Sequence, residues 1–289
     1  MTDSAVKVTG LARTQGAFQL GPLDFELPTG LVMGFVGPNG SGKTTTIKTL
    51  LGMVRPDSGR VQLFDGMAPG AASAKERIGV VLDHLFVTPE WKVESITRRV
   101  GPFFSGWDHT AFHGYLDRFG ISQEAQIGTL SRGEGVKLSL SMALAHHPEL
   151  LILDEPTSGL DPVSRADLVD ILREFMVDPK HSILFSTHIT TDLDNLADLI
   201  LVIDDGQIEY SGTLDGLREG FAMVHGTGQL TPAAAGSVMG LHRTGGRFDG
   251  LIRSDATPLF GPTTVIDDAT TDDVIVHLAR RGATQQENS

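Results

Sequence analysis

Residues 31–45 read Leu31-Val-Met-Gly-Phe-Val-Gly-Pro-Asn-Gly-Ser-Gly-Lys-Thr-Thr45, and the expected fold of this chain follows from them. Its apolar run, residues 31–36, predicts a buried strand, the glycines that follow predict a tight turn, and residues 44–53 have helical spacing. Strand, glycine-rich loop and helix in this order form a phosphate-binding loop, because consecutive N–H groups and the helix N-terminus converge on an anion. A chance match to this pattern is expected about one time in a hundred. An ordinary glycine-rich turn is therefore the weaker interpretation.

The residues of this loop have expected tasks in holding a nucleotide. The glycines permit the tight turn, so that backbone N–H groups point at the β- and γ-phosphates. Lys43 adds a mobile positive charge to those oxygens, and the hydroxyl of Thr44 is placed on Mg²⁺, which bridges the two phosphates. The predicted nucleotide-binding set of the loop is Gly37, Pro38, Asn39, Gly40, Ser41, Gly42, Lys43, Thr44 and Thr45.

Composition narrows the class of protein. The chain has 289 residues, enough for two domains of ordinary size, and we expect two. Lys and Arg number 23 against 36 Asp and Glu, and the formal net charge of −13 argues against nucleic acid as the main partner. Cysteine is absent, which excludes disulfides and thiolate metal sites. The N-terminus lacks a secretory-signal pattern, and no apolar run approaches the roughly 20 residues of a membrane span, so we expect a soluble polypeptide.

A second candidate site begins at Leu130-Ser-Arg-Gly-Glu134, which precedes a helical pattern that stops before Pro148. Ser131, with Glu134 three residues later, is a capping box, so the helix begins at a defined residue with N–H groups exposed. An exposed helix N-terminus favours an anion.

Polar residues also follow two predicted buried strands. The apolar run 150–153 ends in Asp154 and Glu155, and in parallel sheets ligands bind at the carboxyl ends of the strands. Residues 182–186 predict another buried strand, which brings His188 to the same edge. A lone histidine after a strand is often only structural. Its place behind a Ser-Thr pair, in series with the other motifs, favours a functional role.

The remaining segments give a coarse map of the chain. Asp161 and Pro162 predict the start of a helix, and residues 178–179 its end. Residues 88–128 combine helical spacing with aromatic rings, most simply as core or an inter-subunit surface rather than a base-stacking site. We further expect short antiparallel strands in residues 5–28 and a hairpin over 199–210. After about residue 216 we expect a β-rich unit. It should contain a loose stretch at 226–240, a hairpin at Gly245-Gly246, a helix over 271–281 and disorder over 285–289.

In this order the motifs resemble those of the ATP-binding subunit of an ABC transporter, over about residues 6–217. In that family Gly37–Thr45 match Walker A, Leu130–Glu134 the signature sequence, residues 150–155 Walker B, Ser158–Asp161 the D-loop and His188 the switch histidine. The resemblance implies an α/β fold: a P-loop NTPase (ABC ATPase) core with an antiparallel β subdomain and a helical subdomain at about 88–147, all within a domain of residues 1–217. Residues 218–289 are expected to form a small β-rich C-terminal domain for dimer contacts or regulation.

The resemblance also implies cofactors and catalytic roles. ATP and Mg²⁺ are expected, with Thr44 and Asp154 in the Mg²⁺ shell. Glu155, one residue beyond Asp154, is expected to polarise the attacking water as general base. By resemblance His188 contacts the γ-phosphate and holds the attacking geometry.

A second subunit is part of the same expectation. In this family the signature helix of one subunit covers the γ-phosphate held by another, so Ser131, Gly133 and Glu134 are expected to bind a partner's nucleotide, and Asp161 to lie on the dimer seam. Arg132 and Glu134 replace the commoner Gly and Gln of the signature, and the capping logic survives both changes.

The chain departs from the family pattern at two further places. Asp83 stands where a glutamine usually follows the strand before the helical subdomain, and its carboxylate can still reach Mg²⁺ or water. Acids at this position resemble ABC-2 type exporters. Gln15 occupies the usual place of the aromatic residue that stacks on adenine, so that Phe18 or Phe25 is the substitute, or both belong to the core.

These features predict an ATP-hydrolysing subunit that powers a membrane exporter, most like the ABC-2 type of drug, antibiotic or antimicrobial-peptide efflux systems. Its expected partners are a separately encoded permease and a second ATPase subunit, either identical or a sister, with no nucleic acid. Its expected place is cytoplasmic, on the inner face of the membrane. The alternative is a non-transport ABC ATPase acting on a soluble assembly, which would predict a coiled-coil insertion, tandem cassettes or a basic surface. A P-loop kinase would leave the signature helix and the D-loop unexplained.

Overall fold

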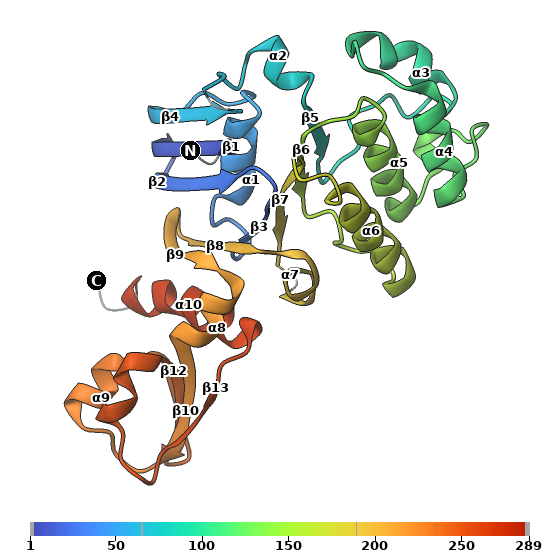
Figure 1. Ribbon diagram of the computed structural model, residues 1–289. Coiled ribbons are helices and arrows are strands. Elements are labelled where there is room, and N and C mark those ends of the chain that lie inside the picture. The colour runs from blue at the N-terminus through green and yellow to red at the C-terminus, as the bar shows by residue number, and fades with distance from the viewer. Residues whose placement is uncertain (1–2, 65, 189, 287–289) are drawn as a thin grey trace.

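The strand that carries the phosphate-binding loop lies inside a six-stranded sheet (Figure 1). In this computed structural model, residues 3–64, 66–188 and 190–286 are described. The first five strands in spatial order are parallel, and the last is antiparallel to its neighbour. In that order the strands are β5 (Ile78–Val81), β6 (Leu150–Asp154), β7 (Ser182–Thr187), β3 (Val32–Val36), β8 (Leu199–Asp204) and β9 (Gln207–Thr213).

Both faces of this sheet are covered, which is why its central strands are continuous apolar runs. Alternate residues of β3 enter different cores: Met33 and Phe35 pack on one side, Val32 and Val36 on the other. The first side is covered by α1 (Lys43–Leu50) and a second sheet, the other by α5 (Arg132–Leu144), α6 (Pro162–Phe175) and α7 (Thr190–Leu196).

The second sheet is antiparallel and has the order β2-β1-β4, with β1 at Ser4–Gln15, β2 at Phe18–Pro28 and β4 at Ser58–Leu63. We expected several short strands in residues 5–28, and this was wrong, because the structure has two long ones. Gly21 and Pro22 do not end the strand, since shifts of register in its pairing with β1 absorb them. The N–H of Gly21 also donates to the carbonyl of Gly206, 2.7 Å away.

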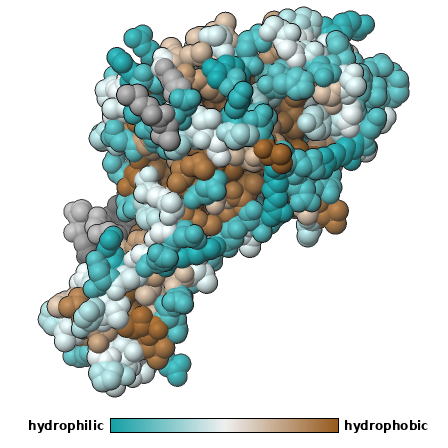
Figure 2. Space-filling view, viewed as in Figure 1, coloured by the Kyte–Doolittle hydropathy of each residue, from teal (hydrophilic) through white to brown (hydrophobic). Residues whose placement is uncertain are grey.

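A helical subdomain, with its own small core, lies beside the edge of the sheet formed by β5 (Figure 1). It contains α3 (Ser95–Arg99), α4 (His109–Phe119) and the outer face of α5, and the short α2 (Ala72–Lys75) precedes it in the chain. Phe112 is fully buried there and packs against Trp107, as expected for aromatic rings that serve as core. Figure 2, which has the same view as Figure 1, shows apolar side chains gathered at the surface in the middle of this face of the molecule.

The C-terminal unit, defined here as residues 214–286, consists of an antiparallel sheet of order β11-β12-β10-β13 with helices around it. The predicted hairpin at Gly245-Gly246 is present, because Thr244 pairs with Arg247 across it. The elements are α8 (Leu214–Gly220), β10 (Phe221–Thr227), α9 (Pro232–Ser237), β11 (Met239–Thr244), β12 (Arg247–Arg253), β13 (Val265–Asp268) and α10 (Thr271–Gln286).

Two expectations about this unit were wrong. The stretch 226–240 is not loose throughout, because α9 forms within it, with Pro232 at its first position and Thr231 as N-cap accepting from the N–H of Ala234. The last helix extends through Gln286, beyond the predicted end, and residues 287–289 lie outside the described part of the chain.

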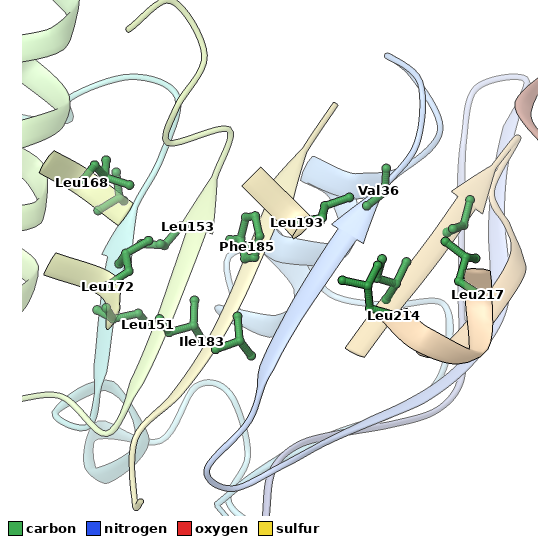
Figure 3. Close-up of a cluster of buried hydrophobic side chains, with 14 of the residues drawn as sticks. Val36, Leu151, Leu153, Leu168, Leu172, Ile183, Phe185, Leu193, Leu214 and Leu217 are labelled. Atoms are coloured by element: carbon green, nitrogen blue, oxygen red, sulfur yellow. The ribbon is translucent and has the colours of Figure 1, made fainter. Parts of the chain in front are cut away.

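The core on the α6 side of the six-stranded sheet continues into the C-terminal unit. Leu214, Leu217, Val274 and Leu278 belong to the same buried cluster as Val36 of β3, and Figure 3 draws several of these side chains from both parts. The domain boundary expected after residue 217 therefore falls within a core that both parts share. Over the described residues, no helix combines the length and apolar character that a membrane crossing requires.

Candidate functional site

A cleft of about 370 Å³ opens where α1 begins and where β6 and β7 end. The phosphate-binding loop and the first turn of α1 contribute Asn39, Gly40, Gly42, Lys43, Thr44 and Thr45 to its lining. The strand ends and neighbouring loops contribute Asp83, Asp154, Glu155 and His188. Residues from distant parts of the sequence thus meet at the carboxyl edge of the parallel strands, where ligands bind in α/β sheets.

Glycine is required at specific positions of the loop. A Cβ on Gly37 would lie 2.0 Å from the carbonyl oxygen of Ile203, and Gly42 has a φ of 110°, which side chains rarely adopt. The start of α1 has no side-chain cap. The N–H groups of residues 43–45 precede the first helical hydrogen bond, which Thr46 donates to Gly42, so they lack helical partners, as an anion site requires.

Lys43 is folded back over the loop. Its ammonium donates to the carbonyl oxygens of Gly37 at 2.7 Å and Pro38 at 3.1 Å, and it lies 3.7 Å from Oε1 of Glu155. Burial lowers the pKa of Lys43 from its ordinary value, while the carboxylates of Glu155 and Asp154 act in the opposite direction. A phosphate oxygen in the cleft would offer this cation a better partner than the two neutral carbonyls.

A hydroxyl and a carboxylate are paired at the base of the cleft. Thr44 Oγ1 donates to Oδ2 of Asp154 at 3.0 Å, and Ser186 Oγ donates to Oδ1 of the same carboxylate at 2.6 Å. Among the described residues no group of three or more acidic or histidine side chains is placed to hold a metal. Mg²⁺ fits such a site, because it is usually held by one or two protein oxygens together with phosphates and waters.

Ser186 was not among the predicted site residues. It orders both acids, because its hydroxyl also accepts from the backbone N–H of Glu155 at 3.0 Å. The signal available in the sequence was its position at the end of a buried strand, two residues before His188. The sequence does not predict that β6 pairs with β7, and this pairing brings Ser186 beside Asp154.

Glu155 and His188 are in direct contact. Nδ1 of His188 lies 2.6 Å from Oε2 of Glu155. Glu155 has a φ of 52°, an uncommon conformation for a residue other than glycine. Its backbone N–H also lies 3.2 Å from the carbonyl of Ser186. Backbone strain of this kind concentrates at functional sites, and here it accompanies the turn that follows Asp154.

Asp83 lines the cleft, where its carboxylate is paired with Arg132. The Nη2 of Arg132 lies 2.8 Å from Oδ1 of Asp83, and Nε2 of His84 lies 3.4 Å from Oδ2. Arg132, the first residue of α5, also lines the cleft. The sequence identified Arg132 only as a departure from the signature, so this ion pair across the cleft was missed.

The comparisons with known proteins agree with this geometry. The profile of the family described as "ABC transporter" matches residues 20–158. The Nod factor export ATP-binding protein I of Burkholderia lata is 35% identical over 204 residues, 68% of this chain and 66% of that protein. The daunorubicin/doxorubicin resistance ATP-binding protein DrrA of Streptomyces peucetius is 33% identical, over 74% of this chain and 67% of that protein. The Nod factor export protein of a Bradyrhizobium strain is 31% identical over 75% and 73%. The chain belongs to the ABC transporter family.

The fold of the chain is that of an ABC ATPase. A solved structure titled as the ATP-binding subunit of an ABC transporter has a TM-score of 0.67 at 25% identity and covers 74% of this chain and 92% of that one. A nucleotide-free ATP-binding cassette has a TM-score of 0.61 at 22% identity, with 73% and 91% covered, which supports the fold alone. The matched part spans 66% of the Burkholderia lata relative and 59% of a Ralstonia nicotianae relative, less than two thirds of each protein.

The signature segment of this ABC chain has the predicted capping box. The N–H of Ser131 donates to Oε2 of Glu134 at 2.8 Å, and the N–H of Glu134 donates to Ser131 Oγ at 3.2 Å. The hydroxyl and the N–H of Ser131 lower the pKa of the Glu134 carboxyl. Ser131, Gly133 and Glu134 are not part of the lining of the nucleotide cleft.

The D-loop of this ABC chain ends in the N-cap of α6. Asp161 Oδ1 accepts from the N–H groups of Val163 and Ser164, both at 3.0 Å, and hydrogen bonds from Ser164 are the main cause that lowers the pKa of Asp161. Like the signature residues, Asp161 does not line the cleft. These predicted nucleotide-binding residues therefore stand outside the lining of the cleft that contains the phosphate-binding loop of their own chain.

The structure separates the two candidates for the residue that stacks on adenine. Phe18 lines the cleft, 3.3 Å from the position of a Cβ on Gly42. Phe25 is buried in the core, with its ring centroid 6.3 Å from that of Phe35. Of the two rings, only Phe18 is placed to contact a base.

Proposed function

We propose that this chain binds Mg-ATP in the cleft described above, hydrolyses it, and thereby powers a membrane exporter of the ABC family. The observation that carries the proposal is the meeting of Lys43, Thr44, Asp154, Glu155 and His188 at one strand edge. These groups supply a cation for the phosphates, oxygen ligands for Mg²⁺, and a carboxylate base beside its partner. Phosphoryl transfer needs all three.

The binding step uses the backbone more than the side chains. The amides of residues 37–45 enclose the β- and γ-phosphates, and Lys43 exchanges its two carbonyl partners for phosphate oxygens. Thr44 and Asp154 would hold Mg²⁺, which would offset the charge that develops on the phosphates. Asp83 would add a further oxygen, for which its ion pair with Arg132 would have to open. Phe18 stacks on the adenine.

In the chemical step, Glu155 takes a proton from the attacking water. The water oxygen forms a bond to the γ-phosphorus, the bond between that phosphorus and the bridging oxygen breaks, and ADP and phosphate result. His188 holds the Glu155 carboxylate through Nδ1, and we assign its Nε2 to the γ-phosphate. Ser186 and the turn at Glu155 keep the carboxylate over the strand edge.

A second ATPase subunit completes the site. Ser131, Gly133 and Glu134 lie outside the cleft of their own chain, at a helix start whose N–H groups suit an anion. We propose that they cover the γ-phosphate held by an identical or sister subunit, with Asp161 on the seam. ATP would then hold the two subunits together until hydrolysis separates them.

An apolar groove supports the proposed membrane partner. It measures about 280 Å³ and is lined by Met53, Leu82, Leu85, Phe86 and Met142 among others. Phe86 is 71% exposed and Met53 56%, so the groove gathers two exposed large apolar side chains at one place on the surface. A second cavity shares Leu82 and Leu85 with this groove and reaches Asp83 and Arg132 of the nucleotide cleft.

We propose that a cytoplasmic segment of a separately encoded permease occupies this groove and senses the nucleotide through Asp83. The chain would then be held at the inner face of the membrane by that contact. The proposed direction of transport rests on the relatives, which are named as export and drug-resistance proteins.

The test is a pull-down of tagged Glu155→Gln protein from detergent-solubilised membranes of its own host, with Mg-ATP. A polytopic membrane protein is expected to co-purify, and Phe86→Glu in the same background is expected to release it. Glu155→Gln combined with Lys43→Ala serves as the control that cannot hold ATP. Reproducible, ATP-dependent recovery of soluble assemblies without a membrane protein would replace the exporter with a non-transport ABC ATPase.

A further inference from the structure

The short helix α7 packs directly on the strand that carries the phosphate-binding loop. It begins at Thr190, two residues after His188. Its Leu193 is fully buried, and a Cβ on Gly34 of β3 would lie 2.2 Å from Leu193 Cδ2. Figure 3 shows Leu193 beside Val36, at the end of the same strand. Because the contact is made to the strand backbone, α7 and the loop cannot move independently by much.

A buried hydrogen bond ties α7 to the segment that follows Glu155. Thr157 Oγ1 donates to Oδ2 of Asp192 at 2.6 Å, and both side chains are buried. The other oxygen, Oδ1, lies 3.9 Å from Nε of Arg165 on α6. A hydrogen bond to a buried carboxylate is strong and expensive to break. The position of α7 therefore fixes the position of Thr157, two residues after Glu155.

The opposite side of α7 is held by the C-terminal unit. Asp194 Oδ1 accepts from Thr271 Oγ1 at 2.8 Å, and from Nη2 of Arg218 at 2.8 Å. Thr271 is buried at the start of α10, and Arg218 belongs to α8. Thr190 Oγ1 adds a longer bond of 3.4 Å to Oδ1 of Asp272.

A helix as short as α7 has little stability of its own, because two turns do not offset the cost of helix nucleation. Tertiary contacts must set its position, and the C-terminal unit supplies those that Asp194 and Thr190 make. We infer that the C-terminal unit positions the catalytic pair Glu155 and His188 through α7, with Asp194 as the positioning residue. This inference rests on the proposed ATPase function, and it assigns the C-terminal unit the task of setting the rate of turnover.

The test compares Asp194→Ala with Asp194→Asn in the full chain. Asp194→Ala removes the acceptor for Thr271 and Arg218, so kcat for ATP hydrolysis is expected to fall between about threefold and thirtyfold, since a misplacement by an ångström costs on the order of a hundredfold. ATP affinity is expected to stay within about twofold, because the P-loop is intact. Asp194→Asn keeps the oxygen acceptor and is expected to recover most of the rate.

The matched control is Asp255→Ala, which removes the same charge from the C-terminal unit at an exposed position that contacts Arg253. It is expected to behave as wild type. Thr271→Val, which removes the hydroxyl at nearly constant volume, is expected to reproduce the effect of Asp194→Ala. Wild-type kcat in both variants would overturn the inference, as would a parallel loss of kcat and ATP affinity with a lowered Tm.

Amide hydrogen exchange separates this inference from the proposed function, because it needs no turnover. Asp194→Ala is expected to speed exchange in residues 190–196 and 155–160 relative to Asp255→Ala. Unchanged protection in both segments would overturn the positioning role, whatever the activity. A wild-type chain that binds but never hydrolyses ATP, with the exchange difference present, would refute the ATPase proposal and leave the coupling through α7 intact.

Discussion

The substitution Glu155→Gln tests the assignment of the general base. The amide has the size of the carboxylate and can still bond to His188, whose Nδ1 lies 2.6 Å from Oε2. Loss of a general base typically costs 10²- to 10⁴-fold in rate, which is about 3 to 5 kcal/mol in the activation free energy. We expect kcat to fall by that amount.

ATP binding should respond in the opposite direction. Glu155 Oε1 lies 3.7 Å from the ammonium of Lys43, and two unit charges near 4 Å attract each other by roughly 4 kcal/mol at an effective dielectric constant of about 20. Phosphate must compete with this attraction for Lys43, and Glu155 also repels the phosphate. Lys43 still donates to its two carbonyl partners before ATP binds. The substitution therefore adds only part of this attraction to the free energy of ATP binding. We expect ATP affinity to rise by up to about tenfold.

Single-turnover hydrolysis and equilibrium binding of a fluorescent ATP analogue measure the two effects separately. Gel filtration with Mg-ATP should show a dimer that persists in the variant and dissociates in the wild type. Hydrolysis within threefold of wild type would remove Glu155 from the role of base. A loss of ATP affinity would refute the competition for Lys43.

The remaining predictions concern the signature helix. Asp83 and Arg132 are both about half exposed, at 45% and 53%, so their coupling in a double-mutant cycle of Asp83→Asn and Arg132→Gln should be about 0.2–1 kcal/mol by urea unfolding. This coupling energy should shrink in about 0.5 M salt, because salt screens exposed charges. An absence of coupling at low salt would contradict the ion pair. The folded-state pKa of Glu134 lies below 4.5 because Ser131 donates to its carboxylate. This contribution to stability is present above that value and is lost as pH falls through the folded pKa. NMR titration should place the midpoint of Glu134 below 4.5, and Ser131→Ala should raise it toward 4.5, whereas an unchanged midpoint would exclude the hydroxyl as the cause.

The parts of the site that the sequence predicted are those with local causes. The capping box of Ser131 and Glu134 and the N-cap at Asp161 involve groups three residues apart or fewer, and both are present. The missed helix α9 had a local signal too, in Thr231 and Pro232. Its sequence, Pro-Ala-Ala-Ala-Gly-Ser, also contains three alanines, which favour helix.

The contacts of the site that the sequence did not predict join elements that are distant in the chain. Ser186 orders Asp154 and Glu155 only because β6 lies beside β7. The pair of Arg132 and Asp83 likewise joins residues 49 positions apart, one at the start of α5 and one after β5. Sequence patterns identify such residues as strand ends or loop residues, and they carry no information on which ends become neighbours.

Local sequence is sufficient to predict the phosphate-binding loop, the helix that follows it and the capped ends of α5 and α6. Their conformations follow from glycine dihedral freedom and from hydrogen bonds within one turn. By contrast, three features depend on how the chain folds in space: Thr157 bonds to Asp192, Asp194 bonds to Thr271, and one core runs from the sheet into the C-terminal unit. These contacts join residues tens of positions apart, and they form because the apolar faces of the sheet and of α10 are buried together.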